Sequence, residues 1–232
     1  MEELRKVLRQ EPKYLLDIAQ MELLEDKLKK LLREDTHDGP EGYCVRSVYF
    51  DTLMMRDYQE KLAGVEQRRK MRVRIYGQGD SSALLEMKQK QGNSQLKRSL
   101  IITREHAAAL CRGDYEPLLT YSDAFASECY GVFRMHTYRP RVLIEYRRKA
   151  FVVPENDIRI TLDSQIKAVK TNQEIFEDQP GLVPVLHTGQ GILEVKYNHF
   201  LLSYVKDILR TCNKSETALS KYAMACRWMR YF

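Results

Sequence analysis

The sequence predicts an α+β fold dominated by an antiparallel β-sheet. About seven segments alternate polar or charged residues with apolar ones, which is the period of a strand whose successive side chains point to opposite faces. Segments with apolar residues at helical spacing occur at intervals between these strands. Turn residues, mainly Asn, Pro and Gly, separate neighbouring strands and favour hairpin connections.

The first half of the chain begins with a helix and continues with strands. In residues 17–35 the apolar residues recur at helical spacing, and Asp17 is placed to cap the helix N-terminus. Residues 43–52 are rich in Val and Tyr, which indicates a strand, and residues 54–64 suit a short helix. An antiparallel meander is then predicted from three strands, at 69–77, 83–90 and 94–103.

The second half repeats this arrangement of helices and strands. Residues 104–136 are mostly helical in pattern. Three further strands are predicted at 141–153, 157–163 and 191–198. The chain closes with two predicted helices, at 200–212 and 218–229.

Composition predicts one globular domain that spans residues 1–232. Of the 232 residues, 44% are hydrophobic and 30% are charged, which is typical of a globular protein rather than a disordered or fibrous one. No segment has the composition of a linker. The 38 basic and 32 acidic side chains give a net charge of +6, which mildly favours anionic partners.

The cysteines and the N-terminus favour a cytoplasmic protein. Five cysteines without a CxxC pair indicate neither a disulfide framework nor a zinc ribbon, as expected in a reducing compartment. The first residues lack the apolar core of a signal peptide, and no run of ~18 apolar residues offers a membrane span.

The main functional signal is a charged face that recurs on distant strands. In "RKMRVRIYG" (69–77) the residues Lys70, Arg72 and Arg74 alternate with Met71, Val73 and Ile75. Basic residues dominate these faces, with single glutamates between them, whereas an ordinary wet strand mixes Thr, Ser, Gln and Glu. The same spacing occurs in four further sets: Arg9, Glu11 and Lys13; Glu86 and Lys88; Arg159, Thr161 and Asp163; Glu194 and Lys196.

This charge pattern predicts an enclosed polar tunnel that binds a polyanion. If helices cover the apolar faces, the charged faces must converge inside a closed or nearly closed barrel. Cations packed at ~5 Å in a partly dry space repel one another, and a bound anion relieves that repulsion. Triphosphate or polyphosphate fits such a tunnel, and glutamates beside phosphates are suited to hold Mg²⁺ or Mn²⁺.

The sequence gives little support for other kinds of site. The sequence has no GxxxxGK[ST] loop, no histidines at metal-ligand spacing and no Ser–His arrangement of a nucleophilic triad. The basic stretch "EQRRKMRVR" (66–74) is compatible with nucleic-acid binding, but its strict alternation favours a sheet face. No DNA partner is expected, and an RNA 5′-triphosphate stays open as a ligand.

Several motifs occur together in the order found in one family. They are "RxExKY", "RKMRVRIYG", "LEMKQK" with a following "KR", "EYRRKAF", "RITLD", "LEVKY" and a late "SKY". With this set, over residues 5–228, the chain resembles the vacuolar transporter chaperone (VTC) domain, the polyphosphate polymerase branch of the CYTH-like triphosphate tunnel metalloenzymes. The resemblance implies an eight-stranded antiparallel β-barrel tunnel with flanking helices, which transfers the γ-phosphate of ATP to polyphosphate.

The resemblance and the shared strand faces together give a set of candidate residues. Catalytic arginines and a lysine that neutralise and align the phosphates are expected at Arg72, Arg74, Lys88, Arg148 and Arg159. Phosphate binding is expected at Lys13, Lys97, Lys196 and Lys221. Metal binding, to Mn²⁺ or Mg²⁺, is expected at Glu194, Glu11 and Glu86.

The departures from the wider tunnel pattern keep alternatives open. Arg9 replaces the first acidic residue of ExExK, which points away from a typical CYTH-type hydrolase, and Pro12 is tolerable at a strand edge. The SPX and membrane segments that accompany the domain in fungi are not seen, so a separate membrane protein would supply coupling to polyphosphate transport. Such a partner would place the protein at the inner face of a membrane.

A triphosphate hydrolase and a non-catalytic polyanion- or RNA-binding barrel are the alternatives, and the oligomeric state is left open.

Overall fold

The chain forms two compact units. The computed structural model describes residues 9–36, 39–92, 94–170, 175–178, 180–210 and 219–229. Unit 1 takes the described parts of Met1–Cys44, Tyr146–Ile166 and Leu186–Leu219, and unit 2 takes those of Val45–Glu145, Lys167–Val185 and Ser220–Phe232. The single domain expected over residues 1–232 stays a prediction.

Unit 1 is built on antiparallel strands with two helices beside them. Strand β11 (Gln190–Asn198) pairs with β1 (Arg9–Gln10) and β2 (Lys13–Asp17) along one edge and with β9 (Ile158–Lys170) along the other. The order continues from β9 to β8 (Tyr138–Val153), which also pairs with β3 (Arg33–Glu34). The helical elements are α1 (Ile18–Leu31), α5 (Ser203–Arg210) and the short 3-10 turn η2 (Glu155–Asp157).

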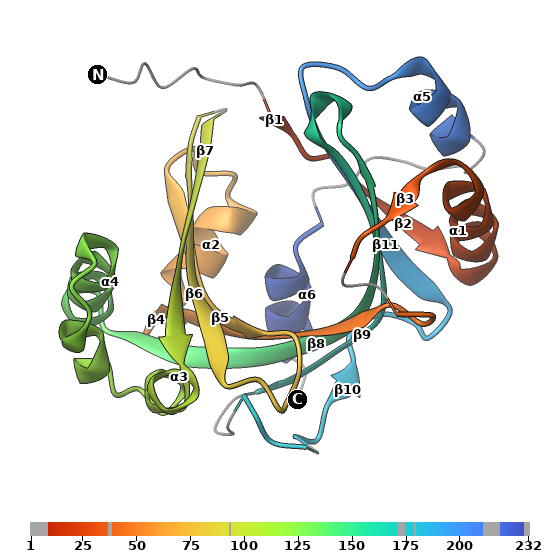
Figure 1. The fold of residues 1–232 in the computed structure, drawn as a ribbon. Coiled ribbons are helices and arrows are strands. Elements are labelled where there is room, and N and C mark those ends of the chain that lie inside the picture. Colours follow the sequence, from red (N-terminus) through yellow and green to blue (C-terminus); the bar gives the residue numbers. More distant parts are fainter. Residues whose placement is uncertain are drawn as a thin grey trace. The chain divides into compact units, whose positions relative to one another are not determined.

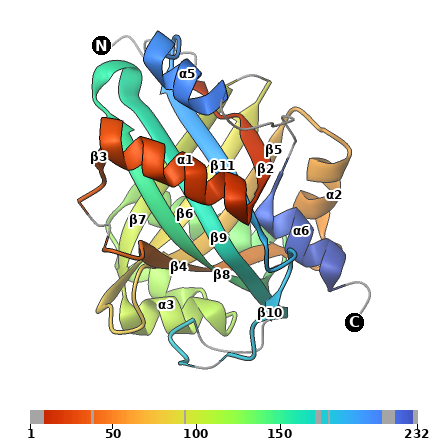
Figure 2. The same cartoon turned by 90° about the vertical axis from the view of Figure 1, so that its right-hand side faces the viewer.

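The core of unit 1 lies between α1 and the apolar face of these strands. Leu24 and Leu28 of α1 are fully buried against Leu193 and Val195 of β11, and Figure 2 shows α1 lying across β9 and β11. Asp17 begins the helix through a capping box, because its side chain accepts a hydrogen bond from the Gln20 amide at 2.8 Å. The strand residues between the apolar ones, including Glu194 and Lys196, therefore point to the opposite face.

Unit 2 is an antiparallel meander with helices packed on it. The strand order is β8, β4 (Tyr43–Thr52), β5 (Arg68–Ile75), β6 (Ser82–Gln91) and β7 (Ser94–Thr103), and Figure 1 shows the last three running side by side. A two-residue strand, β10 (Val183–Pro184), pairs with the end of β9. The helical elements are α2 (Arg56–Leu62), α3 (Arg104–Cys111), the 3-10 turn η1 (Glu116–Thr120), α4 (Ala124–Met135) and α6 (Lys221–Trp228).

The core of unit 2 uses alternate residues of the meander. Met71, Val73 and Ile75 of β5 are buried together with Leu85 of β6 and Phe133 of α4. Because side chains alternate along a strand, Lys70, Arg72 and Arg74 lie on the other face, together with their cross-strand neighbours. The burial of the apolar face thus fixes which side of the meander carries the charge.

The α+β class predicted from the sequence is confirmed, but the strand count is not. The described residues form eleven strands rather than eight. One extra strand arises at Pro12, which has no N–H to donate to the ladder. Pro12 lies between β1 and β2, and both of these strands pair with β11. The other two extra strands, β3 and β10, are two-residue pairings at the margins of the sheet.

Most helix predictions are correct in position but too long. The first helix ends at Leu31 rather than residue 35, because Arg33 and Glu34 pair with β8. The last two helices begin at Ser203 and Lys221, and residues 211, 212 and 218 of the predicted helices lie outside the described residues. Among the described helices, none combines the length and apolar character that crossing a bilayer requires.

Candidate functional site

The predicted site residues divide equally between the two units. Six lie in unit 1, namely Glu11, Lys13, Arg148, Arg159, Glu194 and Lys196. The other six lie in unit 2, namely Arg72, Arg74, Glu86, Lys88, Lys97 and Lys221.

In unit 1, two carboxylates share one lysine. Lys13 and Thr161 are the cross-strand neighbours of Glu194 on β2 and β9, so the three side chains lie on one face. The Lys13 Nζ atom lies 2.6 Å from Glu11 Oε1 and 3.2 Å from Glu194 Oε2. Lys196 Nζ lies 2.6 Å from the other Glu194 oxygen. The carboxylate of Glu194 is therefore held between two ammonium groups.

Burial affects the charge of Lys196. Removal from water lowers the pKa of Lys196, although the carboxylates of Glu194 and Glu11 act to raise it. Arg148 adds to the lowering by charge repulsion, which places it within electrostatic range of Lys196. An anion bound beside Lys196 would favour the ammonium form.

Arg148 is engaged by a buried carboxylate. Its Nε and Nη2 atoms donate to the two oxygens of Asp163 at 2.7 and 2.8 Å, and Asp163 is fully buried. Burial acts against the charge of Arg148, but the attraction of Asp163 outweighs it and keeps the pKa well above the ordinary value. The family resemblance gave Arg148 and the strand pattern included Asp163, but neither predicted this bidentate pair.

Arg159 is also paired, nearer to solvent. Its Nη2 atom lies 2.6 Å from Asp35 Oδ2 and donates to the Tyr43 hydroxyl at 3.2 Å. Each predicted cation of unit 1 thus has a carboxylate partner among the described residues, with Asp163 and Asp35 added to Glu11 and Glu194. The predicted cations of unit 1 are therefore engaged by carboxylates of the same unit.

In unit 2, basic residues outnumber carboxylates on the charged face of the strands. Across β5, β6 and β7, one carboxylate, Glu86, shares the charged face with basic residues from all three strands. These residues include Lys70, Arg72, Arg74, Lys88 and Lys97. Lys88 is directly opposite Lys70 on one side and Lys97 on the other, and like charges directly opposite one another are destabilising. This face is where the charge pattern most strongly favours a bound anion.

Glu86 pairs with three of these basic residues. Its Oε2 atom lies 2.5 Å from Arg72 Nε and 3.7 Å from Arg74 Nε, and its other oxygen forms an ion pair with Lys97. Burial acts to raise the pKa of Glu86, but Arg72, Arg74 and Lys97 outweigh it and lower the pKa to about 2. Glu86 is therefore ionised at neutral pH and fixes the orientation of the two arginines.

Tyr49 belongs to the same face of unit 2, although the sequence pattern does not single it out. It is opposite Arg72 on β4, and its hydroxyl accepts a hydrogen bond from Arg72 Nη1 at 3.0 Å. Its ring stacks on Tyr222 of α6 with the centroids 5.3 Å apart. Burial would raise the pKa of Tyr49, but the charges of Arg72, Lys70 and Arg74 lower it to about 8.

We expect Tyr49 to ionise near pH 8 in the folded protein. The folded-state pKa lies below the unfolded value, so phenolate formation stabilises the fold fully above about pH 10, and this contribution is lost as the pH falls through 8. Between these limits the unfolding free energy of wild type should rise by about 3 kcal/mol relative to Tyr49→Phe.

The measurement is chemical denaturation of both proteins at several pH values, with phenolate absorbance followed in parallel. Tyr204→Phe, at an exposed position of α5, is the control and should keep the absorbance step near pH 8. An unchanged difference between wild type and Tyr49→Phe across this range would contradict the assignment.

Helix α6 contributes to the same face of unit 2. The Tyr222 hydroxyl donates to Asp51 Oδ2 at 2.5 Å, and Lys70 Nζ donates to the Ser220 hydroxyl at 3.3 Å. Ser220 also caps the helix, since its hydroxyl accepts from the Ala223 amide. These contacts place Lys221, the first residue of α6, next to the charged strands.

Two of the predicted metal ligands, Glu11 and Glu194, lie close enough together to bind one metal ion. Mg²⁺ is usually bound through one or two carboxylates together with substrate phosphates. Glu11 and Glu194 meet that requirement, because both lie within ion-pair distance of one Lys13 Nζ atom. Beside them, the buried Thr161 hydroxyl has no hydrogen-bond partner among the described residues. The described residues contain no group of three or more His, Cys, Asp or Glu side chains that could hold a metal without substrate.

Two solved structures share the fold of this chain. One is a Bacillus halodurans protein provisionally assigned as an adenylate cyclase, 12% identical with a TM-score of 0.52 over 92% of this chain and 93% of that chain. Another is a provisionally assigned adenylyl cyclase from Hippeastrum whose dominant activity is that of a triphosphatase. It is 14% identical, with a TM-score of 0.51 over 94% of this chain and 96% of that chain. At these identities the likeness shows the fold.

The family is shown by a separate comparison. The VTC domain model matches residues 8–230, and the chain belongs to the VTC domain family. The resemblance inferred from the motifs is thus confirmed. A search of the curated proteins found no match.

Proposed function

We propose that this chain is a metal-dependent polyphosphate polymerase that uses ATP. The observation that carries the proposal is the charged face of unit 2, where basic residues on three strands share one carboxylate, Glu86. Such a face favours a ligand with repeated negative charge, and Arg forks and Lys point charges both suit phosphate groups. Membership of the VTC domain family supports the same substrate class.

Each unit has residues suited to part of the reaction. In unit 2, Arg72, Arg74, Lys88 and Lys97 would bind phosphate oxygens, with Glu86 and Tyr49 holding Arg72 in place. Lys221 would add a further positive charge. In unit 1, Glu194 and Glu11 would hold Mn²⁺ or Mg²⁺, and Lys13, Lys196, Arg148 and Arg159 would act on phosphate oxygens beside them. When bound, the metal ion would neutralise part of the negative charge of the phosphates.

The proposed reaction needs no side-chain nucleophile. An oxygen of the terminal phosphate of the acceptor chain attacks the γ-phosphorus of ATP. The bond between that phosphorus and the β–γ bridging oxygen breaks, and ADP leaves with the electron pair. The contribution of the protein is to align donor and acceptor and to stabilise the charge of the transferred phosphoryl group. Coupling to membrane transport would need a separate membrane protein.

A triphosphate hydrolase is the second candidate. It is favoured by the fold shared with the Hippeastrum protein, which has a dominant triphosphatase activity. The two reactions differ in the attacking group, which is water in the hydrolase and phosphate in the polymerase.

Product analysis after incubation with ATP and Mn²⁺ tests the proposal. The polymerase is expected to produce ADP and polyphosphate chains, which gel electrophoresis resolves by length. Orthophosphate without chains would establish the hydrolase instead. The absence of turnover with either Mn²⁺ or Mg²⁺ would contradict both enzymes and leave a polyanion-binding protein.

A further inference from the structure

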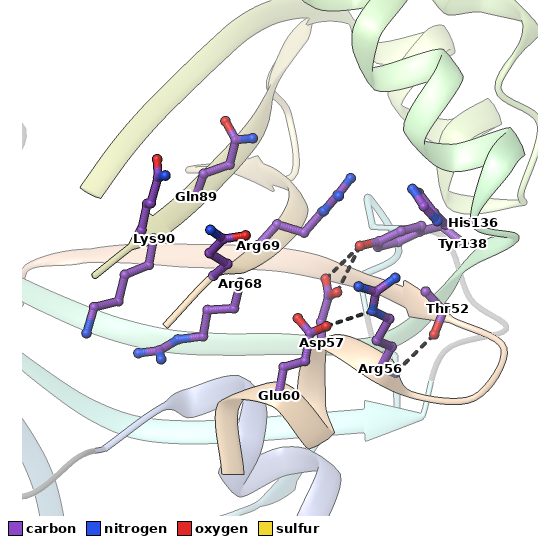
Figure 3. A pocket seen from close by; sticks show the side chains of 12 residues that line it. Thr52, Arg56, Asp57, Glu60, Arg68, Arg69, Gln89, Lys90, His136 and Tyr138 are labelled. Atoms are coloured by element: carbon purple, nitrogen blue, oxygen red, sulfur yellow. Dashed lines mark hydrogen bonds and ion pairs between the residues drawn. The ribbon is translucent and has the colours of Figure 1, made fainter. Parts of the chain in front are cut away.

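Unit 2 has a pocket lined by none of the residues proposed above for phosphoryl transfer. It has a volume of about 290 Å³, and its walls come from the ends of β4, β5 and β6, from helix α2, and from the chain between α4 and β8. Figure 3 shows its basic lining residues together with Asp57 and Tyr138. The volume is at the lower end of the range for small-molecule pockets, so any ligand must be small.

The lining carries more positive than negative charge. Its cations are Arg56, Arg68, Arg69 and Lys90, and its carboxylic acids are Asp57 and Glu60. Arg56 is neutralised locally, because its Nε atom lies 2.7 Å from Glu60 Oε1. By contrast, the side chains of Arg69 and Lys90 make no hydrogen bond or ion pair with any residue that the structure describes.

Asp57 cancels this charge only in part at neutral pH, and less as the pH falls. Its carboxyl group is buried and accepts hydrogen bonds from the Tyr138 hydroxyl, 2.9 Å from each oxygen. Burial, with repulsion from Asp51, raises the pKa of Asp57 to about 7. The positive charge of the lining also acts on His136, because burial and the charges of Arg69 and Arg56 lower the pKa of its ring.

We propose that this pocket is a second anion site, which binds a small phosphate anion such as orthophosphate or pyrophosphate. The half-buried Arg69 supplies the charge, since its side chain extends toward Tyr138 and His136 (Figure 3), and its planar guanidinium can donate two parallel hydrogen bonds to phosphate oxygens. Amide and hydroxyl groups of the lining, including Gln67 and Thr52, add further polar contacts. The inference stands on the pocket alone and does not depend on the proposed polymerase activity.

His136 offers a local readout of this binding. An anion bound within about 6 Å favours the imidazolium form, so its pKa should rise by about 1. The experiment is an NMR pH titration of the His136 ring signal, assigned with His136→Gln. Titrations are compared in sodium chloride, sodium phosphate and sodium pyrophosphate at one ionic strength, so that general screening is the same in each.

Wild type is expected to show a higher His136 pKa in phosphate or pyrophosphate than in chloride. This increase should be lost in Arg69→Gln and kept in Arg134→Gln, which removes an exposed charge of α4 outside the pocket. The anion that gives the larger increase identifies the ligand. An equal His136 pKa in all three salts in wild type overturns the proposal, and this result does not depend on how well any variant folds.

Discussion

Arg148→Leu is expected to lower the free energy of unfolding by about 3–5 kcal/mol. The substitution leaves the carboxylate of Asp163 fully buried without the guanidinium that donates to both of its oxygens. Removing one member of a buried ion pair is strongly destabilising, whereas loss of an exposed ion pair usually costs no more than about 1 kcal/mol. Chemical denaturation measures the difference.

Two further variants separate this explanation from a general effect of the substitution. Arg148→Leu/Asp163→Leu removes both charges and should recover most of the lost stability. Arg159→Leu removes an arginine of β9 whose side chain is about one-third exposed, and it should cost about 1 kcal/mol or less. Equal losses for Arg148→Leu and Arg159→Leu would show that the buried pair is not a major source of stability.

Glu194→Gln is expected to reduce turnover by at least about 100-fold. Loss of a group that only orients a metal ligand costs about 10–100-fold in metal affinity or activity, and loss of a ligand itself should cost more. The amide keeps the shape of the side chain but removes the charge that Lys13 and Lys196 flank. Mn²⁺ affinity, measured by calorimetry in the presence of tripolyphosphate, should fall with the turnover.

The matched control is Glu22→Gln on the exposed side of α1, in the same unit. It removes the same charge and should leave both Mn²⁺ affinity and turnover unchanged. If Glu194→Gln keeps wild-type Mn²⁺ affinity, Glu194 is not a metal ligand, whatever its effect on turnover.

The strand faces could be predicted because they follow from local periodicity. The alternation in "RKMRVRIYG" predicts which residues of β5 face the core, and the structure buries Met71, Val73 and Ile75 as expected. The family motifs depend on the same local patterns, which is why the resemblance was correct over nearly the whole chain. Both inferences use short stretches of sequence.

The partners of the charged residues could not be predicted in the same way. Whether an arginine is available for a ligand depends on residues far away in the sequence, such as Asp35 beside Arg159. Tyr49 has no local feature that separates it from a packing tyrosine, and its importance appears only when Arg72 is opposite it. Similarly, "EQRRKMRVR" indicates positive charge but not that Arg69 lines a pocket with Asp57.

The central claim is that the charged face of unit 2 binds condensed phosphate, and calorimetric titration of tripolyphosphate into wild type and Arg72→Ala tests it most directly. Removing the charge-assisted hydrogen bonds of one arginine should weaken binding by about 10- to 100-fold, because such bonds contribute about 1.5–3 kcal/mol. Arg134→Gln should bind as wild type does. Equal affinity of wild type and Arg72→Ala, with both proteins folded, would contradict the claim.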